Sequence, residues 1–271
     1  MNIRIISGIA IAPVVIFFVV FGGLALKLAI LALSIIGMFE FYRAMKVKFG
    51  LINFVGYFFA IIYMIFAEFI INENNMFNVF TSVFLIILLA CVVLFHTKVN
   101  IKDVMITFFG LFYVTFLLSH IYLVREYTHG NFFVWLIFIC AFGCDTGAYF
   151  SGMLFGKRKL IPTLSPKKTV EGAIGGVVVV AVLAVVFGFC IERYFQLENV
   201  NTIMLCLITG ILGSIVSQIG DLAASAAKRY VGIKDYGNLI PGHGGILDRF
   251  DSVLFTSPVV YYIMLFSIEV L

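Results

Sequence analysis

Long apolar runs dominate this chain and leave membrane-spanning helices as its one practicable fold. Residues are 63% hydrophobic and 12% charged, which excludes an ordinary soluble domain. Isolated helices satisfy their backbone groups in lipid, and the alternating pattern of barrel strands is missing. The sequence predicts an all-α polytopic membrane protein with about nine transmembrane helices of about 20 residues each. Their predicted ranges are roughly 4–22, 24–43, 52–71, 77–96, 103–123, 131–150, 170–191, 202–224 and 251–270.

The distribution of Lys and Arg sets the predicted orientation. With these spans, all but three of the 18 Lys and Arg residues fall on one side of the membrane, the exceptions being Lys27, Arg125 and Arg193. Loops that remain in the cytoplasm carry such an excess of basic residues. We therefore expect the N-terminus in the cytoplasm and the C-terminus outside.

Acidic residues gather near the cytoplasmic ends of the later spans. They are Asp145, Glu171, Asp221, Asp248 and Asp251. An ionisable residue inside a membrane is a candidate for function. Glu40, Glu68 and His120, in the first 130 residues, are scattered instead, and we expect no function for them. Two of the three lie near span ends, where snorkelling or headgroup contact would satisfy them.

A helix through residues 220–229 would place Asp221, Ser225 and Lys228 on one face, since they are spaced i, i+4 and i+7. Small alanines surround them, which permits close helix packing or leaves room for a ligand. A purely structural polar seam is the alternative.

Asp248 and Asp251 would share a helix face if the last helix begins near Ile246. Two carboxylates on one face repel each other unless a cation lies between them, and hard oxygen ligands suit Mg²⁺. An acidic first turn, favoured by the helix dipole alone, is the alternative. Just upstream, His243 stands among the glycines of Pro241-Gly-His-Gly-Gly245, where backbone N–H groups could approach an anion, although a plain turn also explains them.

Leu164-Ser-Pro-Lys-Lys-Thr-Val-Glu-Gly172 looks like a helix start, with Ser165 as N-cap and Pro166 in the first turn. Lys167 and Lys168 would then lie in that turn, where the dipole disfavours cations. This cost favours a bound anion and predicts a phosphate site, with lipid headgroup phosphates as the alternative to a substrate.

Carboxylates, basic segments and Gly-rich backbone on one membrane face are what phosphoryl or nucleotidyl transfer requires, and a site at the membrane edge favours a lipid acceptor. We therefore divide the chain into N-terminal helices, 1–130, for scaffold, dimer or lipid contacts, and a C-terminal catalytic membrane domain, 131–271. Cytoplasmic loops 151–169 and 225–250 belong to the second part.

Residues 225–251, SAAKRYVGIKDYGNLIPGHGGILDRFD, resemble the signature of the phosphatidate cytidylyltransferases (CDP-diacylglycerol synthases). Segments 144–150, CDTGAYF, and 155–172, FGKRKLIPTLSPKKTVEG, are similar to a second block of that family. The resemblance implies transfer of CMP from CTP to phosphatidic acid, giving CDP-diacylglycerol and pyrophosphate. It also implies Mg²⁺ as cofactor, with a monovalent cation such as K⁺ as a second candidate.

The resemblance also implies roles for individual residues. The expected metal ligands are Asp221, Asp248, Asp251 and Asp145. The expected catalytic group is Asp221, Asp248, Lys167, Lys168 and Arg249. The expected substrate-binding residues are Ser165, Thr169, Ser225, Lys228, Arg229, Lys234, Asp235 and His243. One position departs from the pattern: this chain has Ala224 where the family usually has Glu, which puts the second cation in doubt.

Two other functions compete with this interpretation. A CTP-dependent polyprenol or phytol kinase would use similar carboxylates and lysines but would release CDP. A transporter or channel would line a pathway with acidic residues, but it predicts inverted repeats and polarity near the midplane, and the sequence has neither.

The expected partners are CTP, phosphatidic acid, membrane lipids and a second copy of the chain, without nucleic acid. Gly172, Gly175, Gly176, Gly210 and Gly213 could pack helices within one chain or across that homodimer. The expected location is the cell (inner) membrane of a prokaryote, with the active site facing the cytoplasm.

Overall fold

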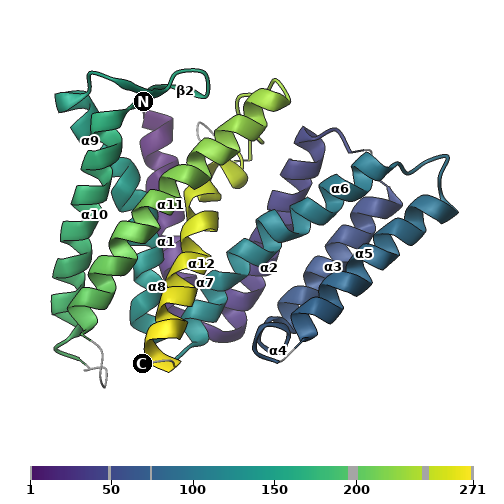
Figure 1. Cartoon of the computed structure of the whole chain (residues 1–271), viewed down its shortest axis with the longest axis horizontal. Coiled ribbons are helices and arrows are strands. Elements are labelled where there is room, and N and C mark those ends of the chain that lie inside the picture. Colours follow the sequence, from purple (N-terminus) through teal and green to yellow (C-terminus); the bar gives the residue numbers. More distant parts are fainter. Residues whose placement is uncertain (1, 48–49, 74, 195–200, 240–243, 270–271) are drawn as a thin grey trace. The chain divides into compact units, whose positions relative to one another are not determined.

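The computed structural model describes residues 2–47, 50–73, 75–194, 201–239 and 244–269 (Figure 1). Most of these residues are helical. The elements are α1 (Asn2–Phe21), α2 (Gly23–Ala44), α3 (Leu51–Ile65), α4 (Ala67–Asn72), α5 (Met76–Leu94), α6 (Ile101–Gly110), the π-helix η1 (Leu111–Phe116), α7 (Leu117–Glu126), α8 (Gly130–Phe138), the π-helix η2 (Ile139–Gly143), α9 (Cys144–Phe155), β1 (Lys159–Ile161), β2 (Ser165–Thr169), α10 (Val170–Ile191), α11 (Thr202–Tyr230) and α12 (Leu247–Glu269).

Helices long and apolar enough to cross a membrane number seven among the described residues. This confirms a helical polytopic membrane protein, whereas the predicted count of about nine is not reached. One predicted span falls short, since α3 ends before Phe66 and is followed by the short α4. Helix α1 has 20 residues, close to the predicted first span. The orientation of the termini stays a prediction.

The chain forms two compact units. The first unit comprises residues 1–123 and 233–249, and the second unit comprises residues 124–232 and 250–271. Segment 233–249 therefore packs with the N-terminal helices, although the sequence alone grouped it with the C-terminal half. Asp248 therefore belongs to the same compact unit as the first 123 residues.

Aromatic side chains fill the first unit where α2, α3, α5 and α6 pack together. Phe84 is fully buried, with its ring centroid 4.7 Å from that of Phe59 and 5.8 Å from that of Phe108. Gly56 and Gly110 both lie against the Tyr42 ring. Large rings facing glycines allow these helices to approach closely without leaving voids.

Small residues hold the second unit together, where α9, α10 and α11 pack side by side (Figure 1). Cys140, Cys144 and Val180 are fully buried at its centre. The glycines predicted to pack helices all contact residues of this same unit. Gly172 meets Gly152, Gly175 meets Ser151, Gly176 meets Cys144, Gly210 meets Ala184 and Gly213 meets Cys140. These glycines therefore pack helices within one chain.

The predicted helix start at Ser165 is wrong. Residues 165–169 form strand β2, which pairs antiparallel with β1 in the register Lys159↔Thr169 and Ile161↔Ser165. Helix α10 begins at Val170, because the Thr169 hydroxyl accepts the Gly172 N–H at 3.1 Å and supplies the N-cap. Lys167 and Lys168 consequently lie on a strand, and the dipole argument for an anion beside them no longer applies.

Candidate nucleotidyl-transfer site

Helices α11 and α12 meet closely at Gly220 in the second unit. A Cβ on Gly220 would lie 2.7 Å from the main-chain oxygen of Asp251 and 2.8 Å from the Phe255 ring. Only glycine permits this approach, which brings the turn of Asp221 beside the turn of Asp251. The charges of Asp221, Asp145 and Lys228 all act on the Asp251 carboxylate, which is 9% exposed.

Lys168 reaches the same region from β2 and forms an ion pair with Asp221. Its side chain is 28% exposed and that of Asp221 is 23% exposed, so solvent or a ligand can reach both. An ion pair of this exposure is worth at most about 1 kcal/mol, and a phosphate can displace the carboxylate from Lys168. We call Asp145, Asp221, Asp251, Lys168 and Lys228 the carboxylate–lysine cluster.

Neighbouring side chains fix the elements that carry this cluster. Gln218, one turn before Asp221, donates from Nε2 to the Ala173 oxygen at 3.1 Å and ties α11 to α10. Glu171, an acidic candidate in the sequence, accepts the backbone N–H groups of Lys157 at 3.0 Å and Arg158 at 3.2 Å. Glu171 therefore anchors the basic segment before β1, whose Lys and Arg side chains remain exposed.

Asp248 belongs to the first unit and is 8% exposed. Its Oδ2 accepts the N–H of Tyr236 at 2.7 Å and that of Gly245 at 2.9 Å. These two bonds hold Tyr236 and Gly245 against the start of α12. Helix α12 begins at Leu247, four residues before the predicted span 251–270, and this meets the condition under which Asp248 and Asp251 lie three residues apart on one helix.

Glu40 is a residue whose importance the sequence reasoning missed. The expectation that it snorkels to headgroups is wrong, because it is 3% exposed. Its Oε1 accepts the Ile246 N–H at 3.1 Å, and its Oε2 accepts the Leu247 N–H at 3.0 Å. A charge inside an apolar span was the signal that could have found it.

The other predicted residues divide between the two units. In the second unit, Lys167 and Arg229 are exposed, Ser165 and Ser225 are partly buried, and the Thr169 hydroxyl serves as the helix cap described above. In the first unit, Lys234, Asp235 and Arg249 are exposed. His243 lies outside the described residues.

The metal ligands remain predictions. In the part of the chain that the structure describes, no three His, Cys, Asp or Glu side chains form a group that could hold a metal ion. The charges of Asp145 and Asp221 nevertheless both act on the Asp251 carboxylate, and such hard oxygen donors suit Mg²⁺. The donor chemistry fits the cation.

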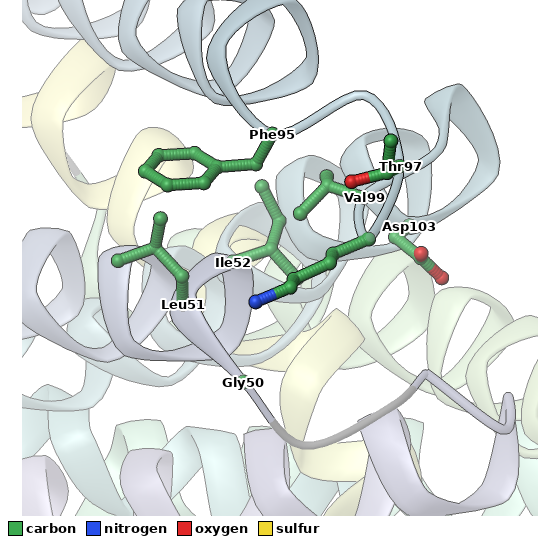
Figure 2. A pocket seen from close by; sticks show the side chains of 8 residues that line it. Gly50, Leu51, Ile52, Phe95, Thr97, Val99 and Asp103 are labelled. Carbon is green, nitrogen blue, oxygen red and sulfur yellow. The ribbon is translucent and has the colours of Figure 1, made fainter.

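A cavity of about 600 Å³ lies elsewhere in the first unit, between the start of α3 and the α5–α6 connection. Figure 2 shows apolar Leu51, Ile52 and Phe95 on one side of it and Thr97 and Asp103 on the other. None of the predicted site residues lines this cavity. The cavity is therefore separate from the candidate site.

Comparison with known proteins decides the family. A model described as the cytidylyltransferase family matches residues 2–267. The chain belongs to the cytidylyltransferase family. Family members transfer nucleotidyl groups, and we therefore regard this chain as a membrane-embedded nucleotidyltransferase.

Named relatives of this cytidylyltransferase-family chain are bacterial. The phosphatidate cytidylyltransferase of Bacillus subtilis is 35% identical over 98% of this chain and 99% of its own length. That of Staphylococcus haemolyticus is 38% identical over 66% of each chain, and that of Staphylococcus saprophyticus is 33% identical over 90% of this chain and 91% of its own. The similarity extends through both units and well beyond residues 143–252, where the sequence motifs lie.

Proposed function

We propose that this chain transfers CMP from CTP to phosphatidic acid, forming CDP-diacylglycerol and pyrophosphate at the cytoplasmic face of a prokaryotic membrane. The relatives named for this reaction support the substrates, because the first of them matches almost the whole chain. The observation that carries the chemistry is the close approach of α11 and α12 at Gly220, which gathers carboxylates beside two lysines.

The lysines of the cluster have a direct use in this reaction. Lys168 exchanges its partner Asp221 for a phosphate oxygen of CTP, and Lys228 carries a second positive charge close to Asp251. The exposed Lys167, Arg229 and Arg249 supply further charge for the phosphates of CTP and phosphatidate. Ammonium and guanidinium groups stabilise phosphoryl oxygens in this way in other nucleotide enzymes.

The cation and the nucleotide have candidate ligands. Asp221, Asp251, Asp145 and Asp248 would hold Mg²⁺, with K⁺ as a second cation. A bound Mg²⁺ supplies charge neutralisation at the phosphates and at the leaving group. Ser165, Thr169, Ser225, Lys234, Asp235 and His243 are the candidates for the nucleotide side.

The bond changes follow from the substrates. A phosphatidate oxygen attacks the α-phosphorus of CTP in line with the bond to the β-phosphate, and that bond breaks to release pyrophosphate. The attacking oxygen is already anionic, so the chain needs no general base. The work of the protein is to position the two phosphates and neutralise their charges.

A labelled-CTP assay with the purified protein in phosphatidate-containing liposomes tests the proposal. The α-phosphate label is expected in the lipid product, with pyrophosphate released, and Asp221→Asn or omission of phosphatidate is expected to abolish the signal. Transfer of the γ-phosphate label to a lipid alcohol, with CDP as the nucleotide product, would establish the kinase instead. The family match to cytidylyltransferases does not favour that alternative.

The cytoplasmic orientation and the homodimer need their own measurements. In a Cys190→Ala background, Lys234→Cys is expected to react with an impermeant maleimide only from the cytoplasmic side, and Lys27→Cys only from outside. Light scattering of the detergent-solubilised protein is expected to give the mass of two chains. Since the glycines named above pack within one chain, the dimer depends on other surfaces.

A further inference from the structure

We propose that Glu40 on α2, assisted by Arg43, is a positioning residue that holds residues 236–237 and 245–248 in the arrangement that presents Asp248 to a cation. The inference rests on the proposed function, in which Asp248 is a metal ligand. All the contacts that carry it lie inside the first unit. The N-terminal helices then contribute to the reaction, although none of the predicted site residues lies in them.

Glu40 supplies the N-terminal cap of α12 from a distance of 206 residues along the chain. The first N–H groups of a helix have no partner within that helix and need an external acceptor. Each oxygen of the Glu40 carboxylate accepts one of them, from Ile246 and from Leu247. A negative charge at this helix end is further stabilised by the helix dipole. Leu247 also packs against Gly37, one turn earlier on α2.

Two glycines make room for that carboxylate. A Cβ on Gly237 or on Gly245 would overlap the Glu40 carboxyl oxygens. Gly237 and Gly245 therefore both lie against the Glu40 carboxylate, and any larger residue at either position would displace the carboxylate. Gly245, which the sequence assigned to the approach of an anionic ligand, instead accommodates an anionic side chain of the protein itself.

Arg43 extends the connection to Asp248 through the backbone of one residue, Tyr236. Its Nη2 donates to the Tyr236 oxygen at 2.9 Å, while the Tyr236 N–H donates to Asp248 Oδ2 at 2.7 Å. The Tyr236 residue is 2% exposed, whereas Arg43 is exposed, so the bond between them is only partly buried. Two residues near the end of α2 therefore bind the backbone around Asp248. Arg43 binds Tyr236, and Glu40 binds Ile246 and Leu247.

The Glu40 carboxylate also lies within range of the charge of Asp248 at the start of α12. Two buried anions remain close only because backbone N–H groups hold both of them. Outer groups that orient a metal ligand typically change metal affinity or activity by about 10–100-fold when removed. We expect an effect of this size from Glu40, expressed in the cation dependence.

Glu40→Gln in the full-length protein tests the assignment. Gln keeps the size of the side chain but leaves one acceptor oxygen for two N–H donors. The matched control is Glu68→Gln, which removes another carboxylate of the same unit, bonded to Tyr122 and away from Asp248. Hydrogen–deuterium exchange of peptides that contain residues 244–250 is followed during a titration with Mg²⁺ alone, and CDP-diacylglycerol formation is followed in parallel.

The expected result is an Mg²⁺ midpoint raised about 10-fold or more in Glu40→Gln, both for protection of the peptide and for the rate. Glu68→Gln is expected to match the parent protein. Arg43→Gln, an exposed position that does not disturb the core, is expected to shift the midpoint in the same direction by less. This second variant keeps the test decisive if Glu40→Gln does not fold.

The outcomes separate the two claims. An Mg²⁺ midpoint equal to that of the parent protein in both variants overturns the positioning role, even if basal exchange or thermal stability changes. A shifted midpoint for protection, in a protein that makes no CDP-diacylglycerol, supports the role of Glu40 and overturns the proposed function. A shift that Glu68→Gln reproduces equally would mean a general loss of fold stability and would also reject the assignment.

Discussion

Gly220→Ala should separate the two helices that carry the carboxylate–lysine cluster. The new methyl group would lie 2.7 Å from the Asp251 oxygen and 2.8 Å from the Phe255 ring. That is roughly 0.7 Å short of an ordinary van der Waals contact, and a packed interior has few voids that could absorb the difference. Helix α12 must therefore move away from α11 by a similar amount or rotate.

The size of the effect follows from this displacement. Overpacking by one methyl group typically costs about 1–3 kcal/mol of folding free energy. For a chain of this size, each kcal/mol lowers the unfolding midpoint by about 2–4 °C. A displacement approaching 1 Å between reacting groups reduces rates by up to about 100-fold. We expect the rate of CDP-diacylglycerol formation to fall by about 10–100-fold, with the thermal midpoint lowered by several degrees.

Gly143→Ala is the matched control in the same unit. The closest atom to a Cβ there is Leu183 Cδ1 at 3.4 Å, an ordinary contact. Since Ala is the better helix former, stability should stay unchanged or rise by up to about 1 kcal/mol. Both variants are compared for CMP transfer from labelled CTP and for thermal unfolding in detergent. Full activity and an unchanged midpoint in Gly220→Ala would refute the reasoning that this contact sets the cluster.

Three further substitutions give separate expectations. Asp248→Asn is expected to abolish CDP-diacylglycerol formation while the protein stays folded and extractable in detergent, because the amide oxygen can still accept both backbone N–H groups; near-normal activity would remove Asp248 from the metal site. Thr169→Val is expected to lower the free energy of unfolding by about 1 kcal/mol through loss of the α10 cap, measured by thermal unfolding; an unchanged midpoint would contradict that role. Ala224→Glu is expected to destabilise the protein, because it introduces a carboxylate at a position that is only 1% exposed. Added Mg²⁺ or K⁺ should then raise the unfolding midpoint of the variant more than that of the parent protein. An equal response of the two proteins would argue against a cation near this position.

Local signals were sufficient for most helices and insufficient at the functional segments. The predicted span 170–191 coincides with α10, because long apolar runs with polar boundaries leave little choice of register. Helix α12 begins four residues before the predicted span 251–270. Ser165-Pro166 carried a helix-cap pattern equally compatible with a strand. Pairing with residues 159–161 decided in favour of the strand, and no local pattern reports such pairing.

The sequence by itself determined that this chain is a helical membrane protein and which acidic and basic residues are candidates for its chemistry, because burial of apolar side chains in lipid depends on composition along the chain. Tertiary structure alone decided their neighbours. Gly220 brings Asp221 to Asp251, and Glu40 reaches Ile246 across 206 residues. Such contacts depend on how helices distant in sequence pack, because a helix end or a carboxylate can be satisfied by many different partners.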